Sequence, residues 1–161
     1  MDKGKFIAHI RKKDKKVQSV KEHVLSVSKI ASDNASKIGL AKAGELIGLL
    51  HDFGKYSNAF QDYIRSATGL INQDEDEYVD SKGLKGKIDH STAGSQLIWN
   101  LAKEKKKQFQ IVSQLLALCV ASHHSGLINC LTVDGGNDFV RRMNKSDNRT
   151  YLNEVSDKAE V

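Results

Sequence analysis

The chain has 161 residues, a formal net charge of +5 and two cysteines, Cys119 and Cys130. This length suits one domain with its own core, and the cysteines lack the close spacing of a metal or redox pair, which favours free thiols in a reducing compartment. No apolar run has membrane-spanning length, and no signal-peptide core follows the N-terminus. We therefore expect a cytoplasmic protein that does not bind a membrane.

The beginning of the chain combines a non-helical segment with a clear helix start. Residues 6–10 and 16–18 flank a basic turn and are compatible with a short hairpin or an extended arm. A helix then begins at Ser19 and Glu22, which fit a capping box, and Gly39 is a suitable end for it. Its apolar residues form a narrow stripe, which comprises Val20, Val24, Val27, Ala31, Ala35 and Ile38.

A second helix is predicted from about Ala41 to the doublet His51-Asp52. Gly44 and Gly48 lie four residues apart within it and lower its intrinsic helix propensity, which indicates close packing against another backbone. The helix is apolar until it ends in an imidazole and a carboxylate. Because a buried, unpaired carboxylate is costly, the aspartate needs a partner, and a metal ion suits both side chains.

Two further helices follow, separated by a polar stretch. Residues 57–69 predict a short helix that begins at a Ser-Asn cap and ends at a glycine. The charged, glycine-containing segment 72–87 predicts a mobile surface loop. Asp89 or Ser91 then caps the next helix, and His90 lies at its start.

Residues 109–124 are the most apolar stretch and leave almost no polar face, which predicts the central buried helix. It ends in His123-His124, so a second core helix also ends in side chains that can bind metal. Weaker patterns indicate helices around 138–143 and 149–155. Because proline is absent and helical spacing dominates, we expect an all-α domain in the form of a compact helical bundle.

The histidines form a pattern with the aspartate of the doublet. Adjacent helical residues point about 100° apart, so a doublet is suited to face two neighbouring ions. A carboxylate can bridge two ions and an imidazole cannot, which makes Asp52 the natural bridging ligand. The candidate metal ligands lie at helix ends or beside an inner stripe: His23, His51, Asp52, His90, His123 and His124.

The alternative is that each inward histidine is a hydrogen-bonded core residue, which is the commoner case for any one of them. Taken together, the candidates are hard to satisfy internally in so small a domain, which favours metal binding. His9 is left outside the set as an ordinary histidine. Cys119 lies one turn before His123, and we interpret it as simple packing in an apolar helix.

The order H…HD…H…HH, with HDFGK at its centre, resembles the HD phosphohydrolase superfamily. It is more closely similar to the HD nuclease domain of the type I CRISPR-associated helicase-nuclease. The resemblance covers residues from about Phe6 to Gly126 and implies a compact HD-domain helical bundle, with 1–161 forming a single HD nuclease domain. The stretches that carry it are 21–24, 48–55, 59–64, 89–91 and 122–126.

The resemblance implies two divalent transition-metal ions. His23, His51 and Asp52 would hold the first, and Asp52 with His90, His123 and His124 would hold the second. Ligands rich in nitrogen favour Fe, Mn, Co, Ni or Zn over Mg, which prefers oxygen. Asp52 and Lys55 would be catalytic, with Lys55 contacting a phosphate oxygen or the nucleophilic water; the alternative for Lys55 is a solvated side chain after a glycine.

The resemblance also implies single-stranded DNA as the substrate, cleaved in CRISPR interference and delivered by a helicase domain or subunit and the crRNA-guided surveillance complex. Basic clusters at 11–16 and 103–107 fit a phosphate backbone, but a solvated turn and an exposed helix end explain them equally well. The alternatives are an HD phosphohydrolase acting on nucleotides or cyclic nucleotides, and an inactive metal-binding interaction module.

The sequence departs from the family pattern in one respect. Members use a further aspartate, well downstream of the double histidine, as a ligand of the first ion. The residues available are Asp134, Asp138, Asp147 and Asp157, none of which stands in a matching stretch. We therefore expect a domain truncated at its C-terminal end, in which the first ion is under-ligated.

Overall fold

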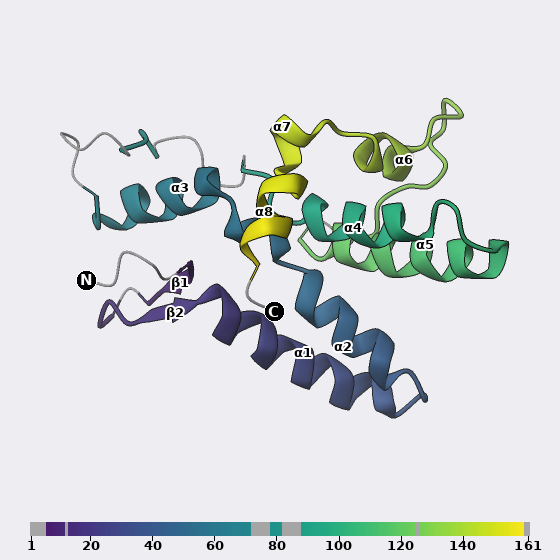
Figure 1. Ribbon diagram of the computed structural model, residues 1–161, viewed down its shortest axis with the longest axis horizontal. Helices are drawn as coiled ribbons and strands as arrows, with labels where there is room; N and C mark the ends of the chain where they lie inside the picture. The colour runs from purple at the N-terminus through teal and green to yellow at the C-terminus, as the bar shows by residue number, and fades with distance from the viewer. Residues whose placement is uncertain (1–5, 12, 72–77, 82–87, 125, 160–161) are drawn as a thin grey trace.

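The computed structural model describes residues 6–11, 13–71, 78–81, 88–124 and 126–159. An antiparallel hairpin, β1 (Ile7–Ile10) and β2 (Val17–Ser19), precedes an otherwise helical chain (Figure 1). This arrangement confirms the all-α prediction and the N-terminal hairpin. The predicted loop at 72–87 lies largely outside the described residues. The helices are α1 (Val20–Ser36), α2 (Ala41–Leu50), the 3₁₀ turn η1 (Phe53–Tyr56), α3 (Asn58–Thr68), α4 (Thr92–Ala102), α5 (Lys107–Ser122), α6 (Asp138–Met143), α7 (Asp147–Thr150) and α8 (Leu152–Lys158).

Helix α1 begins at the predicted capping box. The Ser19 hydroxyl accepts from the Glu22 amide, and the Glu22 carboxylate accepts from the Ser19 amide at 2.9 Å. The predicted stripe holds along the helix itself: Val20 and Val24 are fully buried, and Val27, Ala31 and Ala35 are half-buried. Ile38 is the exception, at 74% exposed. The helix ends at Ser36, so Ile38 lies in the turn that follows and no longer shares the inner face.

Helices α1 and α2 pack side by side along most of their length (Figure 1). The predicted close approach is confirmed at both glycines. A Cβ at Gly44 would lie 2.3 Å from the carbonyl oxygen of Ala31, and one at Gly48 would lie 2.4 Å from the Cα of Ser28. Because these neighbours are backbone atoms, only glycine allows the two helices to come so close.

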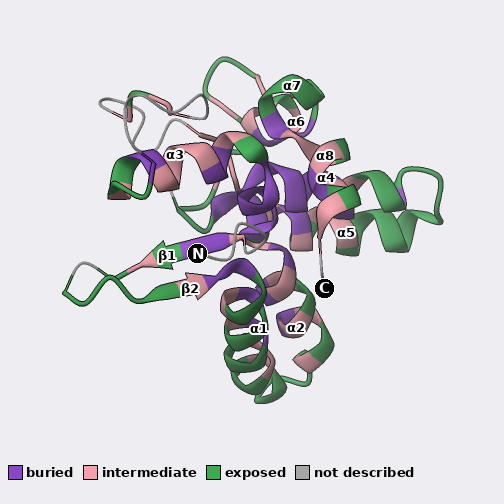
Figure 2. Cartoon of the chain, turned by 60° about the vertical axis from the view of Figure 1, so that its left-hand side comes forward, coloured by how far each residue is buried: buried purple, intermediate pink, exposed green. Residues whose placement is uncertain are grey.

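Helix α5 is not the central buried helix that its composition predicts. Its first turns are exposed, and burial begins only at its C-terminal end with Ala117, Val120 and Ala121 (Figure 2). Helices α4 and α5 form a pair that projects from the domain, so much of the apolar surface of α5 has no cover within the described residues (Figure 1). Cys119 is exposed, so its interpretation as core packing is also wrong. The large apolar residues of α5 that are more than half exposed are Phe109, Ile111, Val112 and Leu115.

The C-terminal helices close the domain over the turn that follows α2. Helix α8 packs against η1 and α4, and the Glu154 carboxylate accepts from the Asn58 amide at 2.9 Å. The predicted helix at 138–143 is confirmed as α6. The one predicted at 149–155 divides into α7 and α8 at Tyr151, which has a left-handed φ of 59°. Within the described residues, no helix is both long and apolar enough to span a membrane.

Candidate metal centre

Asp52 lies at the centre of a cluster to which four parts of the fold contribute. His23 comes from the first turns of α1, and His51 and Asp52 follow α2 directly. The other members are His90, which lies just before α4, and His123 and His124, which follow α5. The carboxyl of Asp52 is buried, with 3% of the residue exposed. The convergence expected from the sequence is therefore found, and the assignment of these residues as ligands stays a prediction.

Gly54 fixes the distance between the doublet and His90. Its amide donates to the His90 carbonyl at 2.9 Å, and a Cβ at this position would lie 2.5 Å from the His90 Cα. The backbone of η1 therefore lies directly against the segment that carries His90. This contact explains why a glycine is needed two residues after Asp52.

One oxygen of Asp52 faces the first pair of histidines. Asp52 Oδ2 lies 2.9 Å from His23 Nε2 and 3.1 Å from His51 Nε2, and the two nitrogens are 3.1 Å apart. Two ligand atoms at right angles on one ion, each with a bond of about 2.1 Å, are about 3.0 Å apart. The three atoms therefore have the spacing of one face of an octahedral site.

The other oxygen faces the remaining three histidines. Asp52 Oδ1 lies 3.5 Å from His123 Nε2, 3.6 Å from His90 Nε2 and 3.9 Å from His124 Nε2. His90 Nε2 and His124 Nε2 are 2.7 Å apart. Oδ1 is buried and accepts no hydrogen bond within the described part of the chain. An unsatisfied buried carboxylate oxygen is costly, so this site fits a cation held between Oδ1 and the nitrogens.

Backbone carbonyls fix the protonation of three of the imidazoles. The Nδ1 atoms of His51, His90 and His123 lie 2.8, 3.1 and 2.7 Å from the carbonyl oxygens of Gly48, Ile88 and Val120. A carbonyl only accepts, so Nδ1 carries a proton in each of these rings, and in the neutral form of the ring the bare nitrogen is the Nε2 that faces Asp52. Bare nitrogens that face a carboxylate are the arrangement of metal ligands oriented by a second layer of hydrogen bonds.

The electrostatics of the cluster favour the forms that bind metal. Burial raises the pKa of Asp52, but the imidazoles of His123, His23 and His51 and the charge of Lys55 outweigh it and hold the pKa well below its usual range. Burial, the neighbouring imidazoles and Lys55 lower the pKa of His124 to about 4, and burial also lowers the pKa of His90. Near neutral pH the cluster therefore combines an ionised carboxylate with at least these two neutral imidazoles.

Lys55 is buried beside the doublet, with 4% of the residue exposed. Its ammonium lies 2.9 Å from Asp52 Oδ2 and donates to His9 Nε2 at 3.2 Å. The alternative of a solvated lysine is therefore wrong. His9 is not among the predicted metal ligands, yet its ring lies 4.7 Å from that of His23. No helical pattern marks this residue, because it comes from the short strand β1.

Three of the downstream aspartates are bonded to groups outside the cluster. Asp134 accepts from the Thr132 hydroxyl, Asp138 pairs with Arg141, and Asp147 accepts from the Asn153 amide at 2.9 Å. Among the described residues, the two groups with metal-ligand spacing are Asp52 with His90, His123 and His124, and His9 with His23 and Asp52. Asp52 is the carboxylate of both.

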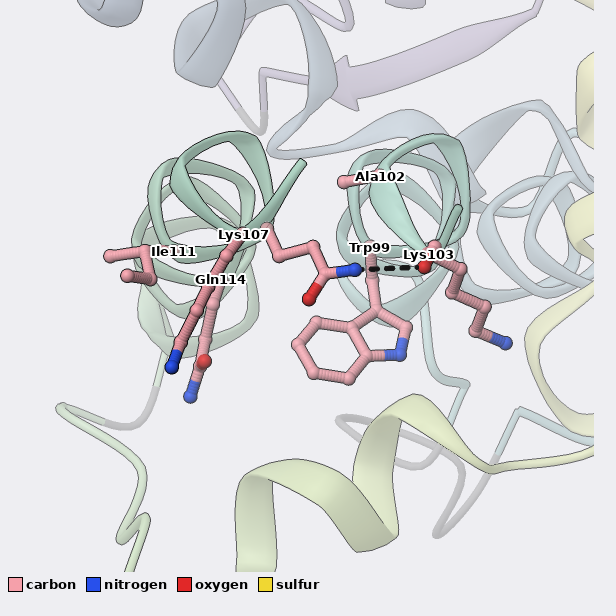
Figure 3. A pocket seen from close by; sticks show the side chains of 7 residues that line it. Trp99, Ala102, Lys103, Lys107, Ile111 and Gln114 are labelled. Carbon is pink, nitrogen blue, oxygen red and sulfur yellow. Dashed lines mark hydrogen bonds between the residues drawn. The ribbon is translucent and has the colours of Figure 1, made fainter. Parts of the chain in front are cut away.

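A separate pocket of about 330 Å³ lies between α4 and α5. The side chains of Trp99, Lys103, Lys107 and Gln114 project from the same side of this helix pair, and Gln110 is tied to the Lys103 carbonyl at 2.9 Å (Figure 3). The pocket contains no member of the histidine–aspartate cluster. It combines an aromatic ring with two cationic side chains.

A helical domain in which a histidine–aspartate doublet meets four further histidines from three other segments defines the HD class of metal-dependent hydrolases. Residues 9–157 match the model of the family described as Cas3, HD domain, and the chain belongs to this family. The family resemblance predicted from the motifs is thereby confirmed. Membership implies a metal-dependent nuclease that operates in the context of CRISPR. A search of curated proteins gave no match to the chain.

Proposed function

We propose that this domain cleaves single-stranded DNA in CRISPR interference, using two divalent transition-metal ions bridged by Asp52. One observation carries the proposal. The buried Oδ1 of Asp52 accepts no hydrogen bond and faces the bare Nε2 atoms of His90 and His123, whereas Oδ2 faces His23 and His51. Each oxygen of Asp52 thus faces its own set of imidazole nitrogens. A cation between each oxygen and its nitrogens would relieve the repulsion between their lone pairs.

The donor set narrows the choice of metal. Five imidazoles and one shared carboxylate are nitrogen-rich, which suits Fe, Mn, Co, Ni or Zn better than Mg. The first set comprises His23, His51 and Asp52, and two imidazoles with one carboxylate on one face are a common arrangement for a first-row metal with open positions. When bound, such ions lower the pKa of water and neutralise charge that develops on a phosphodiester.

The residues of the chain have distinct roles in this proposal. Asp52 holds both ions, and the carbonyl-bound imidazoles keep their Nε2 atoms aimed at them. The ammonium of Lys55, already 2.9 Å from Asp52 Oδ2, contacts a non-bridging phosphate oxygen or the nucleophilic water. Because Lys55 is buried, its electrostatic attraction to a phosphate oxygen is stronger than the attraction between the same two charges in bulk water.

The choice of single-stranded DNA rests on the family and on the pocket between α4 and α5. Single strands are bound by aromatic rings that stack on bases and by cations that track phosphates. Trp99 with Lys103 and Lys107 offers such a combination (Figure 3). As in the family, we propose that a helicase domain or subunit, together with the crRNA-guided surveillance complex, delivers the strand.

The test compares substrates and metals directly. The metal-supplemented protein should cut circular single-stranded DNA, and Asp52→Asn should abolish cleavage, whereas Asp33→Asn, an exposed change on α1, should not. Hydrolysis of nucleotides or cyclic nucleotides without DNA cleavage would instead establish the alternative phosphohydrolase. Metal binding without hydrolysis of either substrate would indicate an inactive interaction module.

A further inference from the structure

Strand β1 carries a bulge next to the candidate metal centre. Ile7 pairs with Ser19 and His9 pairs with Gln18, so the register shifts between Ile7 and His9. A bulge of this kind redirects the side chains that follow it and is common beside active sites. Here it leaves Ile7 and Ala8 buried and turns the ring of His9 toward the ring of His23, at a centroid distance of 4.7 Å.

The side chain of Gln61 forms hydrogen bonds that connect strand β1 to the turn that contains Lys55. Its Oε1 accepts from the Ile7 amide at 2.8 Å, and its Nε2 donates to the carbonyls of Ile7 at 3.0 Å and Lys55 at 2.7 Å. Gln61 is 3% exposed, so these bonds are shielded from water. One buried amide therefore fixes the backbone of β1 relative to the backbone of Lys55.

The ammonium of Lys55 has three protons and three acceptors. They are Asp52 Oδ2 at 2.9 Å, His9 Nε2 at 3.2 Å and the Ala8 carbonyl at 3.5 Å. A buried ammonium is stable only when its protons are bonded. Two of the three acceptors come from β1, so the hairpin is part of the environment that holds the Lys55 ammonium in place.

We propose that His9 is a positioning residue, which accepts a hydrogen bond from Lys55 and holds the ammonium beside Asp52 at the side of the first metal site. The proposal rests on the proposed function for its catalytic consequence. A neutral imidazole has one bare nitrogen, so an Nε2 that accepts from Lys55 does not bind an ion at the same time. Positioning and metal ligation by His9 Nε2 are therefore separable by experiment.

The experiment uses His9→Leu and His9→Gln, because the glutamine amide oxygen can still accept a hydrogen bond and leucine cannot. Gln18→Ala alters the cross-strand partner of His9 and serves as the control for damage to the hairpin. In the zinc-loaded chain, metal content per protein is measured together with the ¹H–¹⁵N signal of the Lys55 ammonium. DNA cleavage by the chain loaded with the active metal gives kcat and KM separately.

We expect His9→Leu to keep the metal content of the unchanged chain, to lose the slowly exchanging Lys55 signal, and to lower kcat by about 10- to 100-fold at similar KM. His9→Gln should restore much of both the signal and kcat, and Gln18→Ala should change neither. Loss of an ion in His9→Leu or His9→Gln, or a Lys55 signal that persists in His9→Leu, would overturn the proposal. If the unchanged chain does not cleave DNA, the metal content and the signal still decide the role of His9.

Discussion

At the scale of single residues, Asp52 differs from the histidines of the cluster because its two oxygens face two different sets of imidazole nitrogens. We expect Asp52→Ala to lose both ions, His51→Ala to weaken the first site alone, and His123→Ala to weaken the second alone. The reason is that His51 faces Oδ2 and His123 faces Oδ1. Elemental analysis of protein equilibrated with zinc or manganese and then desalted measures the number of ions bound.

The control for this series is Asp33→Ala, which removes an exposed carboxylate on α1. Substitution of one imidazole should lower the affinity for the ion that it faces by about 10- to 100-fold or more. Loss of a hydrogen-bond partner outside the ligand set already lowers metal affinity by that amount. An Asp52→Ala chain that retained either ion would contradict a bridging role for this carboxylate.

Asp89 stabilises the segment that presents His90. Its carboxylate accepts from the Lys145 ammonium at 2.6 Å and from the Thr92 hydroxyl at 2.7 Å, and Arg142 lies 3.6 Å away. Burial raises the pKa of Asp89, but these hydrogen bonds and the two positive charges outweigh it and lower the pKa below its usual range. Because the folded pKa lies below the unfolded value, the stabilisation is present above the unfolded pKa and is lost as the pH falls through the folded one.

We therefore expect Asp89→Asn to cost about 1–2 kcal/mol of unfolding free energy at pH 7. The difference should be constant above about pH 5 and shrink as the pH falls below about 4, where the Asp89 carboxyl of the unfolded state begins to take up a proton. Urea unfolding of the metal-free protein at several pH values measures it. A difference that stays constant down to pH 2 would show that charge is not the cause.

At the scale of elements, contact between η1 and the segment before α4 places His90 beside Asp52 Oδ1. A Cβ on Gly54 would lie 2.5 Å from the His90 Cα, and a backbone atom cannot move aside as a flexible side chain can. Gly54→Ala should displace His90 from Asp52 Oδ1 and weaken the second ion more than the first. Calorimetric metal titration checks this, and equal weakening of both ions would point to general loss of structure instead.

The pocket between α4 and α5 allows a direct test of strand binding, because Trp99 is the single tryptophan of the chain. Stacking of a base on its ring should quench its fluorescence when single-stranded DNA is added without metal, so that no cleavage occurs. The double variant Lys103→Glu and Lys107→Glu should weaken binding and reduce its salt dependence. Lys29→Glu, an exposed change on α1, is the matched control. Undiminished quenching in the double variant would place the strand elsewhere.

The comparison of sequence with structure shows which elements local patterns determine. The capping box at Ser19 and Glu22 and the glycines of α2 were predictable because the residues that signal each feature lie within one or two turns of one another in the sequence. The exposure of α5 was not, since an apolar run does not reveal what covers it, and Phe109 is 62% exposed. The histidines of the cluster were predictable because they lie at a helix start or end or beside the inner face of a helix, whereas His9 enters the cluster through a bulge between paired strands.

At the scale of the whole molecule, the candidate metal centre lies where two pairs of packed helices meet. Helix α4 also packs closely against the end of α2, because a Cβ at Gly94 would lie 2.0 Å from the Leu50 carbonyl oxygen. Helices α1 and α2 form one packed pair and α4 and α5 another, and Asp52 faces histidines from both pairs (Figure 1). Ions at this centre would therefore link the two helix pairs in addition to taking part in catalysis. A ligand that binds only the folded state stabilises it by mass action.

We therefore expect metal to raise the melting temperature of the chain. At a free-ion concentration about 100 times the dissociation constant, one ion adds about 2.7 kcal/mol, which for a domain of this size corresponds to about 5–10 °C. Differential scanning calorimetry of chelator-treated protein, with zinc or manganese added back, measures the shift. Asp52→Ala should abolish it, whereas Asp33→Ala should preserve it. An equal shift in Asp52→Ala would mean that the stabilising ions bind outside the histidine–aspartate cluster, and that this cluster does not hold the two helix pairs together.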